Sequence, residues 1–81
     1  MEKIYEYTVI YEPADEGGYI VSVPALPGCH TQGETLIEAK EMAKDAIEGY
    51  LASLQKDGLP IPNEDKTITN MTLADRIFVS I

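Results

Sequence analysis

Near the N-terminus, aromatic and β-branched residues recur at every second position, which is the period of a β-strand. We therefore predict a first strand over residues 4–11, with Tyr5, Tyr7, Val9 and Tyr11 on one face. Pro13 is expected to end it. The run of residues 15–18, Asp-Glu-Gly-Gly, is typical of a tight turn and predicts a hairpin into a second strand over residues 19–23.

Prolines and glycines divide the next segment into short pieces. Pro24 and Pro27 are expected to stop the second strand, because proline cannot donate a hydrogen bond to a sheet. The Leu-Pro-Gly run at residues 26–28 predicts a tight reversal into a short third strand over residues 29–31, and Gly33 is expected to break that strand. The first three strands would form an antiparallel meander.

One long helix is predicted after Gly33. Thr35 and Glu38 have the spacing of a capping box, in which each side chain bonds the backbone N–H of the other residue. Gly58 suits the left-handed position after the last turn, and two prolines beyond it prevent continuation. A continuous apolar stripe would cover one face of the sheet, and it consists of Ala39, Met42, Ala43, Ala46, Ile47, Tyr50, Leu51 and Leu54.

The C-terminal segment predicts a fourth strand over residues 76–81. Before it, residues 67–69 are compatible with a brief strand and residues 70–75 with a turn. A connection through a helix normally returns a strand parallel to one already in the sheet. The predicted fold is thus α+β, a single small domain over residues 1–81 with the order β-β-β-α-β. It has a three-stranded antiparallel meander, a fourth strand, and one helix packed on one sheet face.

Acidic residues outnumber basic ones, 14 against 6, which gives the 81-residue chain a formal charge of −8. Proteins that bind nucleic acid neutralise phosphates with Lys and Arg, so we expect no direct nucleic-acid contact. A basic protein or a cationic ligand is a better match, although a net charge also simply keeps a domain soluble.

Targeting signals and disulfides are not expected. No apolar run approaches the roughly 20 residues of a membrane span, and the N-terminus lacks the apolar core of a signal peptide. Cys29 is the single cysteine, which excludes an internal disulfide. The sequence indicates a cytoplasmic location without membrane association.

Catalysis finds little support in the motifs. Cys29 beside His30 suggests a nucleophile and its base, but neighbouring residues of a strand point to opposite faces. The same two residues supply at most two of the four ligands of a structural zinc site. No Lys-Ser or Lys-Thr follows the glycines at positions 28 and 33, so they do not form a phosphate-binding loop.

A carboxylate metal site is also considered, with Glu6 from the first strand and Glu38 or Glu41 from the helix. Helix capping and solvent exposure explain Glu38 and Glu41 better than metal binding does. We predict no enzyme activity, no cofactor and no metal. The sheet edges remain as a binding surface, and the four tyrosines of the first two strands serve either as interface anchors or as core residues.

The run of residues 17–35, GGYIVSVPALPGCHTQGET, resembles the signature of the HicB-like antitoxin family. Glu38-Ala39 and the run of residues 58–62, GLPIP, resemble it as well, and the similarity covers about residues 4–81. The resemblance implies a truncated ribonuclease-H-like fold of β-β-β-α-β order from which the nuclease carboxylates have been lost.

The same resemblance implies a partner. Members of the family neutralise HicA, a small basic toxin with a double-stranded-RNA-binding-like fold that cleaves messenger RNA with a histidine. Many members also carry a C-terminal ribbon-helix-helix or helix-turn-helix domain that binds their operator. The sequence stops at Ile81 without such a segment, so direct autorepression is not expected.

We therefore predict an antitoxin of a type II toxin–antitoxin pair that binds and occludes a small basic HicA-like toxin, and that forms a homo-oligomer. A solitary oligomeric scaffold or a small-ligand-binding module of the same fold is the alternative. The residues predicted to contact the partner are Tyr19, Cys29, His30, Thr31, Gln32 and Glu34.

Overall fold

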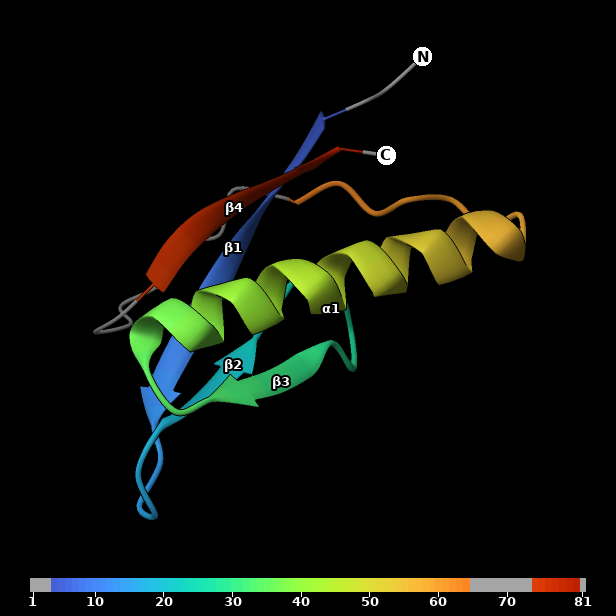
Figure 1. The fold of residues 1–81 in the computed structure, drawn as a ribbon. Helices are drawn as coiled ribbons and strands as arrows, with labels where there is room; N and C mark the ends of the chain where they lie inside the picture. The colour runs from blue at the N-terminus through green and yellow to red at the C-terminus, as the bar shows by residue number, and fades with distance from the viewer. Residues whose placement is uncertain (1–3, 65–73, 81) are drawn as a thin grey trace.

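A computed structural model describes residues 4–64 and 74–80 as one sheet covered by one helix (Figure 1). The elements follow the order β1 (Ile4–Pro13), β2 (Tyr19–Ser22), β3 (His30–Gly33), α1 (Leu36–Lys56) and β4 (Ala74–Ser80). Within the sheet the order is β3-β2-β1-β4, and each pair of neighbours is antiparallel. The predicted α+β class and element order are confirmed.

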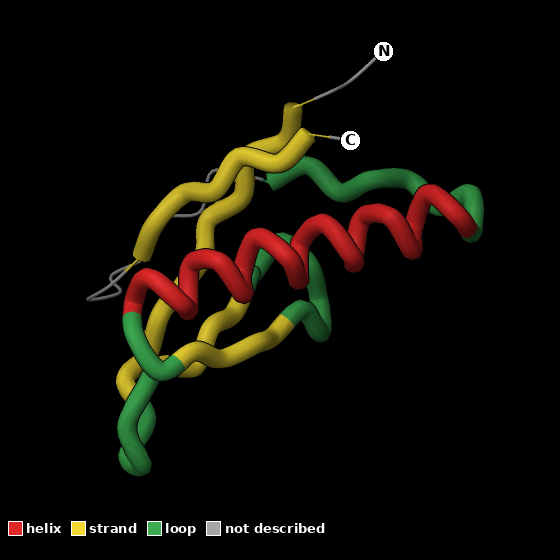
Figure 2. Tube along the Cα trace, in the orientation of Figure 1, coloured by secondary structure: helices red, strands yellow, loops and turns green. Residues whose placement is uncertain are grey.

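The direction of β4 differs from the expectation that a helical connection gives parallel pairing. β4 pairs with β1 and runs antiparallel to it, with Tyr7 opposite Ile77. The reason lies in the segment after the helix. Residues 57–64 turn back along the domain, so that β4 starts at the end of the sheet where α1 also starts (Figure 2).

Several strand ends also differ from the prediction. β1 continues to Pro13, which lies opposite Tyr19 where the hairpin closes and where no further ladder bond is needed. β3 begins at His30 and ends at Gly33, so this glycine terminates the strand as its last residue.

The beginning of β4 was expected to be a turn. Ala74 and Asp75 instead pair with Ile10 and Val9 and belong to the strand. The proposed brief strand at residues 67–69, the rest of the proposed turn and Ile81 lie outside the described residues.

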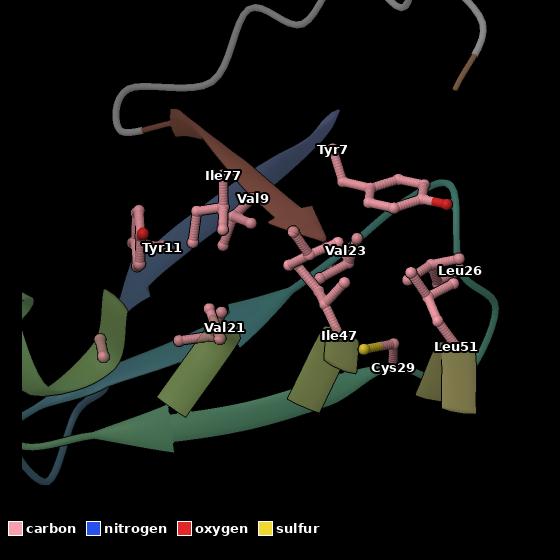
Figure 3. Close-up of a cluster of buried hydrophobic side chains, with 13 residues drawn as sticks. Tyr7, Val9, Tyr11, Val21, Val23, Leu26, Cys29, Ile47, Leu51 and Ile77 are labelled. Atoms are coloured by element: carbon pink, nitrogen blue, oxygen red, sulfur yellow. The ribbon is translucent and has the colours of Figure 1, made fainter. Parts of the chain in front are cut away.

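The helix carries one face into the core. Ala39, Ala43, Ile47 and Leu51 are fully buried in the centre of its stripe, while Met42 at its margin is partly exposed. Figure 3 shows Ile47 and Leu51 of the helix facing side chains of the sheet, with Leu26 entering from the loop before β3. The largest fully buried side chains are Tyr7, Leu26, Ile47, Leu51, Val9, Val21 and Val79.

The tyrosines divide between the core and its margin. Tyr7 and Tyr11 are buried, which confirms the core alternative for these two residues. Tyr5 and Tyr19 are partly buried and pack against the same cluster.

The helix begins and ends with hydrogen bonds that use its free backbone groups. Thr35 Oγ1 accepts the Glu38 N–H at 3.0 Å, as a capping box requires. The Glu38 carboxylate, however, accepts the N–H of Glu34 at 3.1 Å, where the sequence predicted that of Thr35. At the other end, Gly58 has a φ of +70° and the Leu59 N–H donates to the Leu54 carbonyl at 2.8 Å, which is a Schellman motif.

Two side chains of β1 hold the segment that follows the helix. The Tyr7 hydroxyl donates to the Pro62 carbonyl at 2.7 Å. Both the N–H and the hydroxyl of Thr8 donate to the Glu64 carboxylate, the hydroxyl at 2.8 Å. β2 pairs with β1 only from Ile10 onward, so Glu64 satisfies a backbone donor that β2 does not reach.

Candidate functional site

An open groove of about 820 Å³ lies between the β1–β2 turn, the end of β3 and the first turns of α1. We call it the acidic groove; residues 13–20, 32–34, Glu38 and Met42 line it. Figure 1 shows the hairpin turn projecting past the sheet at this end of the molecule, next to the start of the helix.

Two close backbone approaches build the groove. A Cβ on Gly33 would lie 2.4 Å from the Ala39 nitrogen, so β3 meets the helix at a distance that excludes any side chain. A Cβ on Gly18 would lie 2.8 Å from the Gly33 carbonyl oxygen, and Gly18 has a φ of +76° that favours glycine. The hairpin turn therefore rests directly on the end of β3.

Local hydrogen bonds stabilise the projecting turn. The Ala14 N–H donates to the Gly18 carbonyl, and the Gly17 N–H donates to the Ala14 carbonyl, both at 3.0 Å. The exposed Asp15 and Glu16 are thus presented on an ordered turn.

The charge of the lining has one sign. Asp15, Glu16, Glu34 and Glu38 contribute four carboxyl groups, and the described residues that line the groove include no Lys or Arg. Such a recess repels anions and attracts cationic groups, and its field adds to that of the whole chain with its charge of −8. The arrangement suits a basic side chain or a basic protein surface.

The structure brings together three of the six residues predicted for partner contact. Tyr19, Gln32 and Glu34 line the acidic groove. Cys29, His30 and Thr31 are not among its lining residues.

Alternation along β3 explains that division. The exposed His30 lies on the same side of the sheet as Gln32, whereas Thr31 points to the helix side and is partly buried. Cys29 is buried among the core side chains, and this burial raises the pKa of its thiol. The protonated thiol is a weak nucleophile, so the geometry gives no support to a Cys–His pair.

The sequence does not predict partner contact for the other lining residues, which include Asp15, Glu16, Glu38 and Met42. An acidic pair directly before two glycines was the available signal. This acidic pair predicts only a turn from the sequence, because its nearness to Glu34 and Glu38 depends on how the turn packs against β3.

The carboxylate metal site considered from the sequence, with Glu6 from β1 and Glu38 or Glu41 from α1, does not form. Glu6 bonds Arg76 at 2.8 Å on the sheet face opposite the helix, away from Glu38 and Glu41. Arg76 also lies 3.0 Å from Glu64. The hydrogen bond from Arg76 lowers the pKa of Glu6.

Within residues 4–64 and 74–80, no group of three or more His, Cys, Asp or Glu side chains is arranged to hold a metal ion. Nor does any helix in these ranges have the length and hydropathy of a membrane span.

The described residues form an antiparallel sheet covered by one helix, with an acidic recess beside the start of that helix. This architecture defines the class of the protein as a small α+β domain. The chain belongs to the HicB-like antitoxin family of bacterial toxin–antitoxin systems, whose family profile matches residues 7–78. This family is one of antitoxins, which confirms the prediction that the chain is not an enzyme.

Individual relatives agree with this assignment. The chain is 40% identical to the UPF0150 protein ssr1765 of Synechocystis sp. over 89% of its own length and 91% of that protein. It is 39% identical to antitoxin HicB 1 of Photorhabdus laumondii, covering 95% of this chain and 53% of the longer antitoxin. The crystal structure of the N-terminal domain of Burkholderia pseudomallei antitoxin HicB superimposes with a TM-score of 0.73 at 27% identity, covering 94% of this chain and 96% of that domain.

Proposed function

We propose that this chain acts as an antitoxin that binds a small basic HicA-like ribonuclease and keeps it from cleaving messenger RNA. Membership of the HicB-like family supports the antitoxin role. The observation that carries the choice of surface is the acidic groove, which gathers four carboxyl groups beside an ordered turn. In this proposal the groove receives basic side chains of the toxin that would otherwise hold RNA phosphates.

Electrostatics supports this surface in two ways. The charge of −8 steers a basic partner toward the chain over distances of about a Debye length, which is roughly 8 Å at physiological salt. The groove then offers the opposite charge at close range, where complementary side chains fix the orientation of the two proteins. Occlusion follows when the same basic residues of the toxin can no longer contact RNA.

Self-association is part of the proposal. β4 is an edge strand of seven residues, and Phe78 on it is 61% exposed. Unpaired strand edges favour pairing with another chain. Sedimentation of the free chain gives its mass, and a purely monomeric chain would remove this part of the proposal.

The test uses the product of any small basic reading frame adjacent to the gene for this chain, together with a fluorescent RNA substrate. We expect the wild-type chain to co-elute with that protein and to suppress RNA cleavage. Asp15→Lys reverses a charge in the groove, and we expect the Kd to rise about five- to tenfold at low salt. Added salt should narrow this difference.

Asp57→Lys is the matched control, because it changes net charge equally at an exposed residue at the far end of α1. Its Kd should stay close to the wild-type value. Equal losses in the two variants would assign the effect to net charge and reject the groove. Undiminished cleavage without co-elution would reject the antitoxin proposal itself.

A further inference from the structure

β4 forms one edge of the sheet, and no other strand of the described residues lies beyond it. It pairs with β1 over all seven of its residues without a bulge. Natural proteins usually protect such an edge with lysine, proline or a bulge, and β4 contains neither of these residues. The opposite edge strand, β3, has only four residues and ends where the helix backbone approaches. β4 is therefore the edge that can accept a further strand.

The hydrogen bonds of β1 show which backbone groups point outward from β4. The Thr8 N–H on β1 donates to Glu64 and therefore points away from β4. Thr8 lies opposite Arg76, so this pair exchanges no ladder bonds, and the Arg76 N–H and C=O point outward. The Arg76 N–H donates to Asp75 Oδ1 of its own chain at 2.8 Å. The other residues whose N–H and C=O groups point outward by the same alternation are Ala74, Phe78 and Ser80.

Both charged side chains of β4 are paired within their own chain. The Lys40 ammonium lies 3.2 Å from the Asp75 carboxylate, and the Arg76 guanidinium lies 2.8 Å from Glu6. A further strand at this edge therefore meets no unpaired charge. Phe78 is 61% exposed on the sheet face opposite α1, so covering its ring adds an apolar contact.

The residues of β4 are complementary to those of a second, antiparallel copy of the same strand. With Ile77 opposite Ile77 of the second copy, Ala74 lies opposite Ser80 and the whole strand overlaps. Arg76 then lies opposite Phe78, a pair in which a cation can rest beside an aromatic ring. Each outward N–H except that of Arg76 faces a carbonyl of the second copy, because outward groups oppose outward groups in this register.

Other ways of pairing β4 are less favourable. An axis at Arg76 places two arginines opposite each other, where like charges repel. An axis at Phe78 shortens the overlap within β4, and a shift by a single residue sets outward groups against inward ones. Pairing of β4 with β3 of another copy leaves a free edge at each end and builds an open chain, whereas pairing of β4 with itself closes.

We propose that two copies of this chain pair antiparallel through β4, with the two-fold axis at Ile77, and form a closed dimer with one continuous sheet. The inference rests on the self-association in the proposed function and specifies its surface and register. The described lining of the acidic groove includes no residue of β4, so both grooves of the dimer stay open to a basic partner.

Cysteine cross-linking tests the register. Ala74→Cys and Ser80→Cys change exposed residues and are prepared as separate variants, one with a tag that alters its mass. Opposite residues of an antiparallel pair have Cα atoms about 4.5–5.5 Å apart, within the range of about 4.4–6.8 Å that a disulfide spans. We expect a disulfide-linked heterodimer in the oxidised mixture and little linkage in either variant alone. The wild-type chain is the control, since its Cys29 is buried.

Phe78→Lys tests the contact across the axis, because it places a lysine opposite Arg76 of the second copy. We expect the dimer Kd to rise at least about tenfold in sedimentation experiments. Ile20→Lys is the matched control, since it makes the same charge change at a 50% exposed residue of β2, and its dimer Kd should not rise. Both copies carry a charge of −8, so added salt should lower the dimer Kd, whereas it should weaken binding of a basic partner.

The possible outcomes separate this inference from the antitoxin role. A monomeric wild-type chain would overturn the dimer and the self-association, and leave binding at the acidic groove in place. A dimer whose two cysteine variants do not link to each other, or in which one variant links equally well to itself, would overturn the β4 pairing. Equal rises in Kd for Phe78→Lys and Ile20→Lys would overturn it as well. Failure of the wild-type chain to bind the basic protein would reject the antitoxin proposal alone.

Discussion

Gly33 lies where the backbones of β3 and α1 approach each other too closely for any side chain. A Cβ there would lie 2.4 Å from the nitrogen and 2.6 Å from the Cα of Ala39. Both atoms belong to the helix backbone, so they cannot move aside as the end of a flexible side chain can. Gly33 thus lets β3 run directly into the helix start, and the hairpin turn packs on that junction.

Gly33→Ala should therefore lower the free energy of unfolding by about 2–3 kcal/mol, the upper part of the range for overpacking, because the atoms in the way belong to the backbone. Gly49→Ala is the matched control, since a Cβ on this helical glycine meets no atom within 4 Å. It should raise the free energy of unfolding by up to about 1 kcal/mol, because alanine favours the helix. Urea unfolding measures both, and equal effects would show that the Gly33 contact is not strained.

At the scale of elements, the start of α1 determines where the acidic groove lies. Thr35 fixes its first turn, and the Glu38 carboxylate joins that turn to Glu34 at the end of β3. The Schellman motif at Gly58 then directs the following segment back toward β1. Start and end signals therefore set both the length of the helix and the route of the chain beyond it.

Thr35→Ala should cost about 1 kcal/mol of the free energy of unfolding, since it removes the acceptor for the Glu38 N–H. Thr35→Ser keeps a hydroxyl oxygen at this position and should retain most of the stability. Thermal unfolding of the two variants checks this. Similar losses in both would indicate that the threonine methyl group, and not the cap, is important.

At the scale of the whole molecule, a charged cluster joins the two ends of the described chain. Arg76 on β4 bonds Glu6 and Thr8 on β1, and it pairs with Glu64 from the segment after the helix. Three parts of the sequence that lie far apart therefore meet on the face of the sheet opposite α1. Exposed ion pairs contribute little individually, but this cluster gives folding a dependence on pH.

The hydrogen bond from Arg76 lowers the pKa of Glu6 below its ordinary value of 4.5. The resulting stabilisation is present above the pKa of the unfolded chain and is lost as the pH falls through the lower pKa of the folded chain. We expect the urea midpoint to decrease when the pH is lowered below about 4.5, and Glu6→Gln should make this decrease shallower. An identical pH profile for both proteins would contradict this linkage.

Much of the fold follows from local patterns. The period of two in β1 and the helical stripe from Ala39 to Leu54 reflect which side chains must be buried, and the structure confirms both elements. The antiparallel direction of β4 could not be predicted in this way. It depends on residues 57–64 turning back along the sheet, which is a packing outcome of Pro62 and Glu64 against β1.

The candidate site was less predictable than the fold. Tyr19, Gln32 and Glu34 meet in the groove because the hairpin turn folds against β3. The signature residues Cys29 and Thr31 instead point toward the core or its margin, since alternation along a short strand sends neighbours to opposite faces. No local pattern distinguishes Tyr11 from Tyr7, although only Tyr7 has a hydrogen-bond partner among the described residues.

The sequence by itself determined the elements, the acidic charge and the family, because periodicity, capping residues and ordered glycines and prolines act over a few neighbouring residues. Only the tertiary structure decided which side chains share a recess. The carboxyl groups of the acidic groove come from positions 15, 16, 34 and 38. Such groupings depend on close backbone approaches such as Gly33 against Ala39, and the packing of distant segments sets these distances.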